Sequence, residues 1–209
     1  MPYHTFEFRQ DPNSTIPSAP TDFSWPLQLI DWRKWTHMGY NEGSYLSVYS
    51  TYEYYAKVPP SLLRLMIWMF REKTFRKTCS LRSITYVAIF PTGDYMVGLA
   101  DVMTNIRGLR HLNLQLAPEP KSTIMDDPKR MKRAQPGDLW LELNRSYTTL
   151  NNLQWTANAS LSSRDYRWPA LVDILDDDHH LGGLSRRGWT KVGNATWSRD
   201  EVSQATTSE

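Results

Sequence analysis

The chain has 209 residues, a formal net charge of +2, nine tryptophans and eleven tyrosines. This length fits one domain, and the aromatic content favours a packed globular protein over a disordered one. A single cysteine excludes an internal disulfide, and the longest apolar block, residues 62–70, is too short to span a bilayer. We therefore expect a peripheral membrane contact at most. Since no catalytic, metal-binding or cofactor motif stands out, we also expect a protein that is not an enzyme and needs no cofactor.

Residues 1–24 form a polar N-terminal arm that contains Pro17-Ser18-Ala19-Pro20. The two prolines favour an extended backbone, and the flanking residues have little apolar surface to bury. We expect this arm to be disordered and the tetrapeptide to dock into a groove of another protein. An ordinary proline-rich linker is the alternative.

Five elements are expected in the first half of the domain. They are a Tyr- and Val-rich strand over 45–55, a helix that Pro60 opens, with an apolar face over 62–70, a strand over 83–90, a turn at 91–94 and a partner strand over 95–103. The change of hydrophobic period from 3.6 to 2 after the helix separates helical from extended segments.

Alternating apolar residues predict more strands in the second half. In chain order we expect a strand over 111–116, a polar and basic loop over 118–137, strands over 139–143 and 153–161, a helix over 169–180 that ends at Gly182-Gly183, and a hairpin over 189–197. No internal repeat is evident. The sum is an α+β fold, a single domain over 25–198 with an antiparallel sheet and two main helices, followed by a polar tail over 199–209.

The charges are distributed unevenly. Residues 61–133 carry thirteen Lys and Arg against six Asp and Glu. Such a basic block suits anionic lipid headgroups or, non-specifically, nucleic acid, although a solvated loop explains its last part equally well. The cations that we expect to bind lipid or phosphate are Arg71, Lys73, Arg76, Lys77, Lys121, Lys129, Arg130, Lys132 and Arg133.

An acidic cluster near the end of the domain contains Asp173, Asp176, Asp177, Asp178, His179 and His180. The acids lie at the C-terminal end of the expected helix, where the helix dipole disfavours them, so we interpret them as a solvated patch and not as a metal site. Three of these residues, Asp173, Asp176 and Asp177, could contact the basic block of a second copy head to tail and build an open lattice.

The PSAP arm, the small basic α+β domain and the C-terminal third together resemble the matrix proteins of rhabdoviruses, and of vesiculoviruses in particular. In the C-terminal third the similar features are a strand pair around Leu139 to Leu161, a helix through Leu171 to Leu175, Gly183-Leu184 and a final strand at Ala195-Thr196-Trp197. Two family features are missing here, a Lys-rich arm and a Pro-Pro-x-Tyr motif.

The resemblance implies a structural protein of the virion that self-associates beneath the membrane, binds the viral nucleoprotein and drives budding. It implies that Pro17, Ser18, Ala19 and Pro20 recruit a subunit of the host ESCRT-I complex. The expected locations are the virion, the host cytoplasm, the inner face of the host membrane and the host nucleus. The alternative is a small nucleic-acid-binding viral accessory protein, such as a suppressor of RNA silencing.

Overall fold

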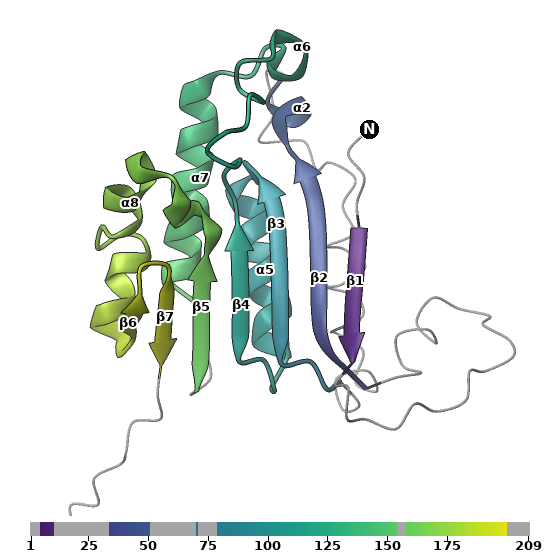
Figure 1. Ribbon diagram of the computed structural model, residues 1–209, viewed down its shortest axis with the longest axis vertical. Coiled ribbons are helices and arrows are strands. Elements are labelled where there is room, and N and C mark those ends of the chain that lie inside the picture. Colours follow the sequence, from purple (N-terminus) through teal and green to yellow (C-terminus); the bar gives the residue numbers. More distant parts are fainter. Residues whose placement is uncertain (1–4, 11–33, 51–69, 71–78, 154–157, 200–209) are drawn as a thin grey trace, which may run out of the picture.

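One seven-stranded sheet organises the chain (Figure 1). The computed structural model describes residues 5–10, 34–50, 70, 79–153 and 158–199. The strands are β1 (Thr5–Gln10), β2 (Trp35–Ser44), β3 (Ser83–Ile89), β4 (His111–Gln115), β5 (Ala159–Ser163), β6 (Thr190–Gly193) and β7 (Thr196–Arg199), in the spatial order β1-β2-β3-β4-β5-β7-β6. The expected single domain of mixed helix and strand content is confirmed.

The centre of the sheet is parallel, which corrects the expected antiparallel sheet. Strands β2, β3, β4 and β5 pair parallel to one another in chain order, whereas β1 and the hairpin β6–β7 pair antiparallel at the two sides. Alternation of apolar and polar residues reports only that one face of a strand is buried, not its direction. The direction follows from the connections, because parallel neighbours need a long crossover.

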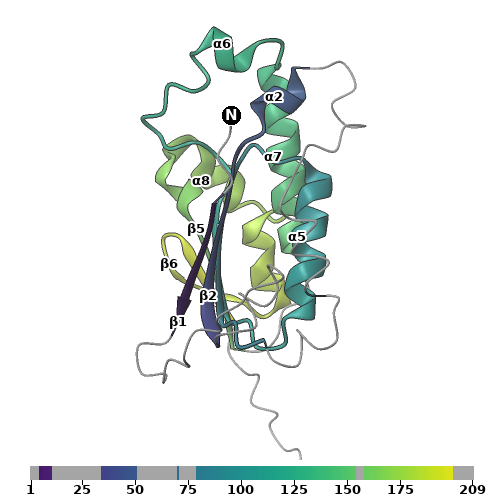
Figure 2. The ribbon, with the colours of Figure 1, turned by 90° about the vertical axis from the view of Figure 1, so that its right-hand side faces the viewer.

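The two longest helices, α5 (Gly93–Asn105) and α7 (Pro136–Asn151), lie on one side of the sheet. The shorter elements are α2 (Leu46–Tyr49), α6 (Pro128–Met131), α8 (Pro169–Leu175) and the 3₁₀ helices η2 (Arg164–Arg167) and η3 (Leu181–Arg187). Figure 1 shows β3 and β4 in front of α5, and Figure 2 shows α5 and α7 side by side on the same side of the strands. Strands β3 and β4 are thus each followed by a helix, α5 and α7, that returns over the same face.

The apolar pattern of β3 recurs once, in β4, at a spacing of 28 residues, and this recurrence was not recognised in the sequence. Leu81-x-x-Ile84-x-Tyr86-x-Ala88 recurs as Leu109-x-x-Leu112-x-Leu114-x-Leu116, and the backbone pairs Ile84 with Leu112 and Tyr86 with Leu114. All eight side chains are buried. Equivalent residues of the two units therefore stack on one another across the sheet.

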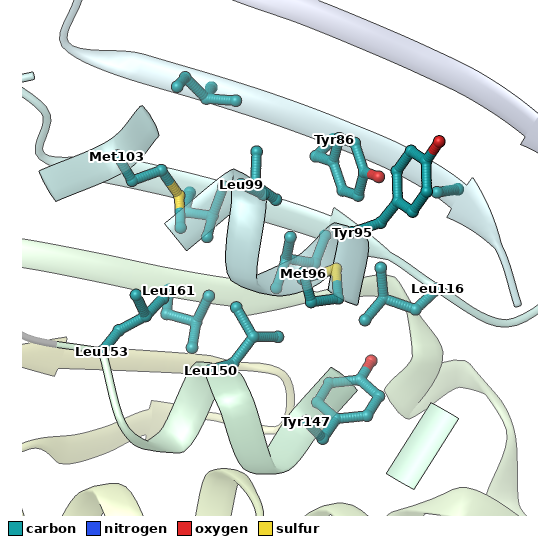
Figure 3. Close-up of a cluster of buried hydrophobic side chains, with 14 of the residues drawn as sticks. Tyr86, Tyr95, Met96, Leu99, Met103, Leu116, Tyr147, Leu150, Leu153 and Leu161 are labelled. Atoms are coloured by element: carbon teal, nitrogen blue, oxygen red, sulfur yellow. The ribbon is translucent and has the colours of Figure 1, made fainter. Parts of the chain in front are cut away.

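The core lies between the sheet and the helices α5 and α7 (Figure 3). Met96, Leu99 and Met103 of α5 meet Leu150 of α7 and Leu161 of β5 there, and each is buried. The apolar positions of α5 and α7 recur at helical spacing, so each helix presents one continuous apolar stripe to the sheet.

Helix α5 replaces the strand that was expected over 95–103. Pro91-Thr92 stops the preceding strand, and the Thr92 carbonyl accepts hydrogen bonds from the backbone of Tyr95 and Met96. Asp94 lies in the first turn, where a carboxylate favours the helix dipole. The buried positions 95, 96, 99, 102 and 103 follow a period of 3.6, which was mistaken for a period of 2.

Helix α7 replaces the strand that was expected over 139–143. Pro136 occupies the first turn, and Leu139, Leu143, Tyr147 and Leu150 form one buried stripe. Leu141 completes the apparent alternation but is 46% exposed. Its exposure shows why three alternating leucines did not distinguish a strand from a helix.

The remaining expectations have mixed outcomes. The strand over 83–90, the strand over 111–116 and the terminal hairpin are confirmed, and the strand over 153–161 is displaced to β5. The strand expected over 45–55 is wrong in its described part, residues 45–50, because β2 ends at Ser44 and a helical turn, α2, follows. The helix expected from Pro60 lies outside the described residues.

The expected boundaries of the arm and the tail also shift. Residues Thr5–Gln10 belong to the sheet as β1, so the segment 1–24, expected to be disordered, contains a strand. Strand β7 extends to Arg199, which was assigned to the tail. The expected helix over 169–180 is divided into α8 and a turn before η3.

Candidate functional site

The face of the sheet opposite α5 and α7 is polar. Along each parallel strand the residues between the buried apolar positions point to this open face. They are His37, Gly39 and Asn41 on β2, Ser83, Thr85, Val87 and Ile89 on β3, His111, Asn113 and Gln115 on β4, and Ser160 and Ser162 on β5, with Glu7 and Arg9 of β1 paired alongside. Most of these residues are half-buried or exposed, which is unlike the fully buried apolar face.

Two His–Ser pairs form one row across the four parallel strands. His37 Nδ1 lies 3.0 Å from Ser83 Oγ, and His111 Nδ1 lies 2.7 Å from Ser160 Oγ. Partial burial lowers the pKa of His37, and the nearby Arg9 guanidinium lowers this pKa further. The imidazole of His37 is therefore neutral near pH 7.

These pairs do not form a catalytic triad in the part of the chain that the structure describes. A nucleophilic serine needs a histidine whose second nitrogen a carboxylate orients. The one carboxylate beside His37 is that of Glu7, which instead accepts a hydrogen bond from Arg9 Nε at 2.7 Å. The row therefore presents imidazole and hydroxyl groups that can donate and accept hydrogen bonds on the open face.

A second polar cluster is fully buried and holds β4, β5 and α7 together. One carboxylate oxygen of Asp165, Oδ2, accepts hydrogen bonds from the Leu116 backbone N–H at 2.8 Å and from the Tyr147 hydroxyl. Tyr147 Oη also lies 2.8 Å from Ser163 Oγ. Burial raises the pKa of Asp165 to about 6, although its hydrogen bonds act in the opposite direction. Since Asp165 is 2% exposed, this cluster has a structural role.

The acidic cluster that the sequence singled out lies beside a cleft between α7 and α8. The cleft has a volume of about 760 Å³, and Trp140, Leu141, Ile174, Asp173 and Asp177 are among its lining residues. Among the described residues no three His, Cys, Asp or Glu side chains are arranged to hold a metal ion.

Other contacts already engage most of that cluster. Asp176 forms an ion pair with Lys191 Nζ at 2.6 Å and accepts a hydrogen bond from the Tyr166 hydroxyl at 2.7 Å. Asp178 pairs with Arg186. Head-to-tail self-association through Asp173, Asp176 and Asp177 stays a prediction, and Asp176 would have to exchange its partners to take part.

The basic segment expected to bind lipid or phosphate lies at one end of the sheet. Lys121, Lys129, Arg130, Lys132 and Arg133 are all exposed in or around α6. Figure 1 shows α6 beyond the C-terminal ends of the parallel strands. Arg71, Lys73, Arg76 and Lys77, and the tetrapeptide Pro17, Ser18, Ala19 and Pro20, lie outside the described residues, so their expected roles stay predictions.

The row on the open face was not recognised from the sequence. His37 and His111 lie 74 positions apart, and nothing in their immediate neighbours indicates that they share a surface. The available signal was the 28-residue period, because it aligns Ser83 with His111 and so indicates that both belong to one face.

Comparison of the chain with protein-family models, curated proteins and solved structures finds no significant match. In the described residues no helix has the length and apolar character needed to cross a bilayer.

Proposed function

We propose that this chain is a protein-interaction module, a short solenoid of strand-and-helix repeats that binds a partner polypeptide on the open face of its sheet. The observation that carries this proposal is the stacking of successive parallel strands in chain order, with α5 and α7 on one face and a polar surface on the other. Solenoid repeats stack neighbour on neighbour and commonly use their continuous outer surface for binding.

The repeat pattern supports this class of protein. Leu109-x-x-Leu112-x-Leu114 matches the L-x-x-L-x-L part of the leucine-rich-repeat signature, and Leu81-x-x-Ile84-x-Tyr86 follows it with Ile and Tyr in place of two leucines. Their spacing of 28 residues falls within the range of about 20–29 for such repeats. Each such unit contributes one strand to a sheet and one helix to its back. The chain is therefore proposed to be a leucine-rich-repeat-like protein.

The size of the open face sets how a partner must bind. Seven strands at about 4.8 Å spacing, each with about five residues at 3.3 Å, give a surface of roughly 500 Å². A stable interface buries about 800 Å² on each partner. A partner must therefore also contact the ends of the strands, and the row of His–Ser pairs provides hydrogen-bonding groups at the centre.

The proposal is tested with a photo-crosslinking amino acid placed at Thr85 or Asn113 on the open face. The matched control places it at Val97, which is 56% exposed on α5 on the helical side. We expect a discrete, saturable adduct with one partner from the open-face positions. This partner, once purified, should bind the unlabelled chain directly, and Thr85→Arg with Asn113→Arg should abolish the binding. Equal adducts from Val97, or purified partner that binds the double variant normally, would refute the proposal.

A viral matrix function remains a second proposal. The observation that favours it is the exposure of Lys129, Arg130, Lys132 and Arg133 in one segment. However, the strand pair on which part of the resemblance depended is absent, because Leu139 lies in α7. Flotation with phosphatidylserine vesicles tests this proposal. Binding should fall when salt exceeds about 0.15 M, where charges are screened over about 8 Å, and replacing the four cations by Ser should remove it. Equal flotation with neutral vesicles would refute it.

A further inference from the structure

The N-terminal ends of β2, β3 and β4 carry a group of exposed cations. Lys34 directly precedes β2, Arg82 directly precedes β3, and Arg107 and Arg110 lie in the turn before β4. In the part of the chain that the structure describes, none of the four forms an ion pair with a carboxylate. This group, named here the basic edge, lies at the opposite end of the strands from α6 (Figure 1).

Two of these cations, Arg82 and Arg110, directly precede adjacent strands, and their backbones are hydrogen-bonded to each other. The Arg82 backbone N–H donates to the Thr36 carbonyl at 2.8 Å, and the Arg110 N–H donates to the Arg82 carbonyl at 2.8 Å. Adjacent strands are about 4.8 Å apart, so two positive side chains start from adjacent backbone positions. Like charges directly across a sheet destabilise it. A bound anion would remove this repulsion.

The guanidinium groups keep free donors for such an anion. Arg82 Nη1 donates to the Gly108 carbonyl at 3.3 Å, which uses one of the five N–H donors of this side chain. Gly108 allows this approach, because a Cβ at that position would lie 1.7 Å from Arg82 Nη1. The Arg82 side chain is thereby directed towards the turn that holds Arg107.

Directly beside the basic edge lies the row of His–Ser pairs. The Ser160 backbone N–H donates to the Arg110 carbonyl at 2.6 Å, and Ser83 follows Arg82 in the chain. Glu7 is the one acidic residue on the open face among the described residues, and Arg9 already pairs with it. The centre of the open face is thus polar but uncharged, and the basic edge lies at the N-terminal ends of its strands.

We propose that the basic edge binds an acidic segment of the partner polypeptide, with Asp or Glu carboxylates on Arg82 and Arg110 and the rest of the segment on the His–Ser row. This proposal rests on the proposed function and specifies its partner. Charge complementarity favours an anion, and the planar guanidinium of an arginine binds a carboxylate through two parallel N–H donors. Nucleic acid is disfavoured, because the basic edge and the His–Ser row include no Phe, Tyr or Trp on which bases could stack, and the neighbouring Trp35 packs against the hydrophobic core.

The test uses the full chain and a fluorescein-labelled twelve-residue peptide in which glutamate alternates with serine. The control peptide has glutamine in place of glutamate. Anisotropy at 50 mM salt should show binding of the glutamate peptide at least tenfold tighter than the glutamine peptide. Arg82→Gln with Arg110→Gln should weaken the binding about tenfold. The matched variant, Lys129→Gln with Arg130→Gln, changes the net charge equally at the other end of the sheet and should change the affinity less than twofold.

Three outcomes would overturn the proposal. One is an equal loss of affinity in the two variants, which would show attraction by overall charge alone. Another is equal binding of the two peptides. The third is tighter, Arg82- and Arg110-dependent binding of a twelve-residue oligouridine, which would assign nucleic acid as the ligand. Equal urea midpoints for both variants would exclude misfolding as a cause of the loss.

The crosslinking experiment separates this proposal from the proposed function. If the chain with the photo-crosslinker at Thr85 still captures its partner while the glutamate peptide does not bind, then the acidic class of ligand is wrong and the interaction face stands. If the peptide binds at the basic edge while Thr85 captures nothing, then the basic edge is an anion site separate from any protein interface, which also overturns the proposal as stated.

Discussion

Replacing Asp165 by Asn should remove the pH dependence that this residue gives to folding. The native carboxyl has a pKa of about 6 because burial disfavours its ionised form, whereas an ordinary aspartate has a pKa near 3.8. The folded state therefore holds its proton more tightly than the unfolded state. Ionisation then opposes folding, so the free energy of unfolding falls as the pH rises from about 4 through 6, and levels off above that range.

The size of the effect follows from the two pKa values. Each unit of difference corresponds to 1.36 kcal/mol, and the part of the titration between pH 4.5 and 7.5 amounts to about 2 kcal/mol. The amide side chain of the Asp165→Asn variant carries no charge at either pH. Relative to wild type, this variant should therefore gain about 2 kcal/mol of unfolding free energy between these two pH values. Any loss from altered hydrogen bonding to Leu116 and Tyr147 is a constant offset that cancels in this comparison.

The assay is urea unfolding at several pH values between 4.5 and 7.5, followed by tryptophan fluorescence. Asp173→Asn serves as the control, since it removes an exposed carboxyl and its stability should follow wild type at every pH. If the free energies of Asp165→Asn and wild type differ by the same amount at pH 4.5 and at pH 7.5, then Asp165 is not a carboxyl whose buried charge opposes folding, and the reasoning fails.

Two further predictions concern the same core. Tyr147→Phe removes the hydroxyl that donates to Asp165 and contacts Ser163. Urea unfolding at pH 7 should therefore show a free energy of unfolding that is lower by about 1–3 kcal/mol. A decrease below about 0.5 kcal/mol would mean that the cluster does not hold the strands together. Leu112→Ala truncates a side chain of β4 that is 1% exposed, and it should lower the free energy of unfolding by about 2–5 kcal/mol. Leu141→Ala, at a position 46% exposed, should lower it by about 0.5 kcal/mol or less. Similar costs at the two leucines would contradict the assignment of the core face.

The sequence predicts the strands best where alternation and turn signals agree. Ser83 to Ile89 is a run of β-branched and aromatic residues closed by Pro91, and Trp189 to Trp197 is interrupted by Gly193-Asn194, so both were identified correctly. The helix over 139–143 was predicted as a strand, because residues 139 and 143 are neighbours on a helix as well as on one face of a strand. Only the later members of the stripe, Tyr147 and Leu150, decide between the two periods.

Strand direction and the open face could not be obtained from local pattern alone. The sequence predicted a strand over 95–103. Such a strand would pair with β3 as a hairpin, and the predicted sheet was therefore antiparallel. With the same residues as a helix, the connection from Ile89 to His111 becomes a crossover, and β4 must pair parallel to β3. The wrong hydrophobic period over 95–103 therefore led to a wrong sheet topology. Because of that topology, the 28-residue spacing of β3 and β4 was not recognised, and His37 and His111 were not placed on one face.

The reversed strands at both sides of the sheet bear on how this protein can change in length. Strand β1 runs against β2 at one edge, and at the other side the antiparallel β7 separates β5 from β6, which again runs in the direction of β5. A unit inserted between two of the parallel strands would leave both flanking arrangements unchanged, so the interior is the natural place for growth by tandem duplication. A second copy of residues 81–108 would insert one more strand and helix between β3 and β4 and leave both flanks intact. It would also place a third arginine beside Arg82 and Arg110, so a longer version of the chain would bear a longer row of positive charge.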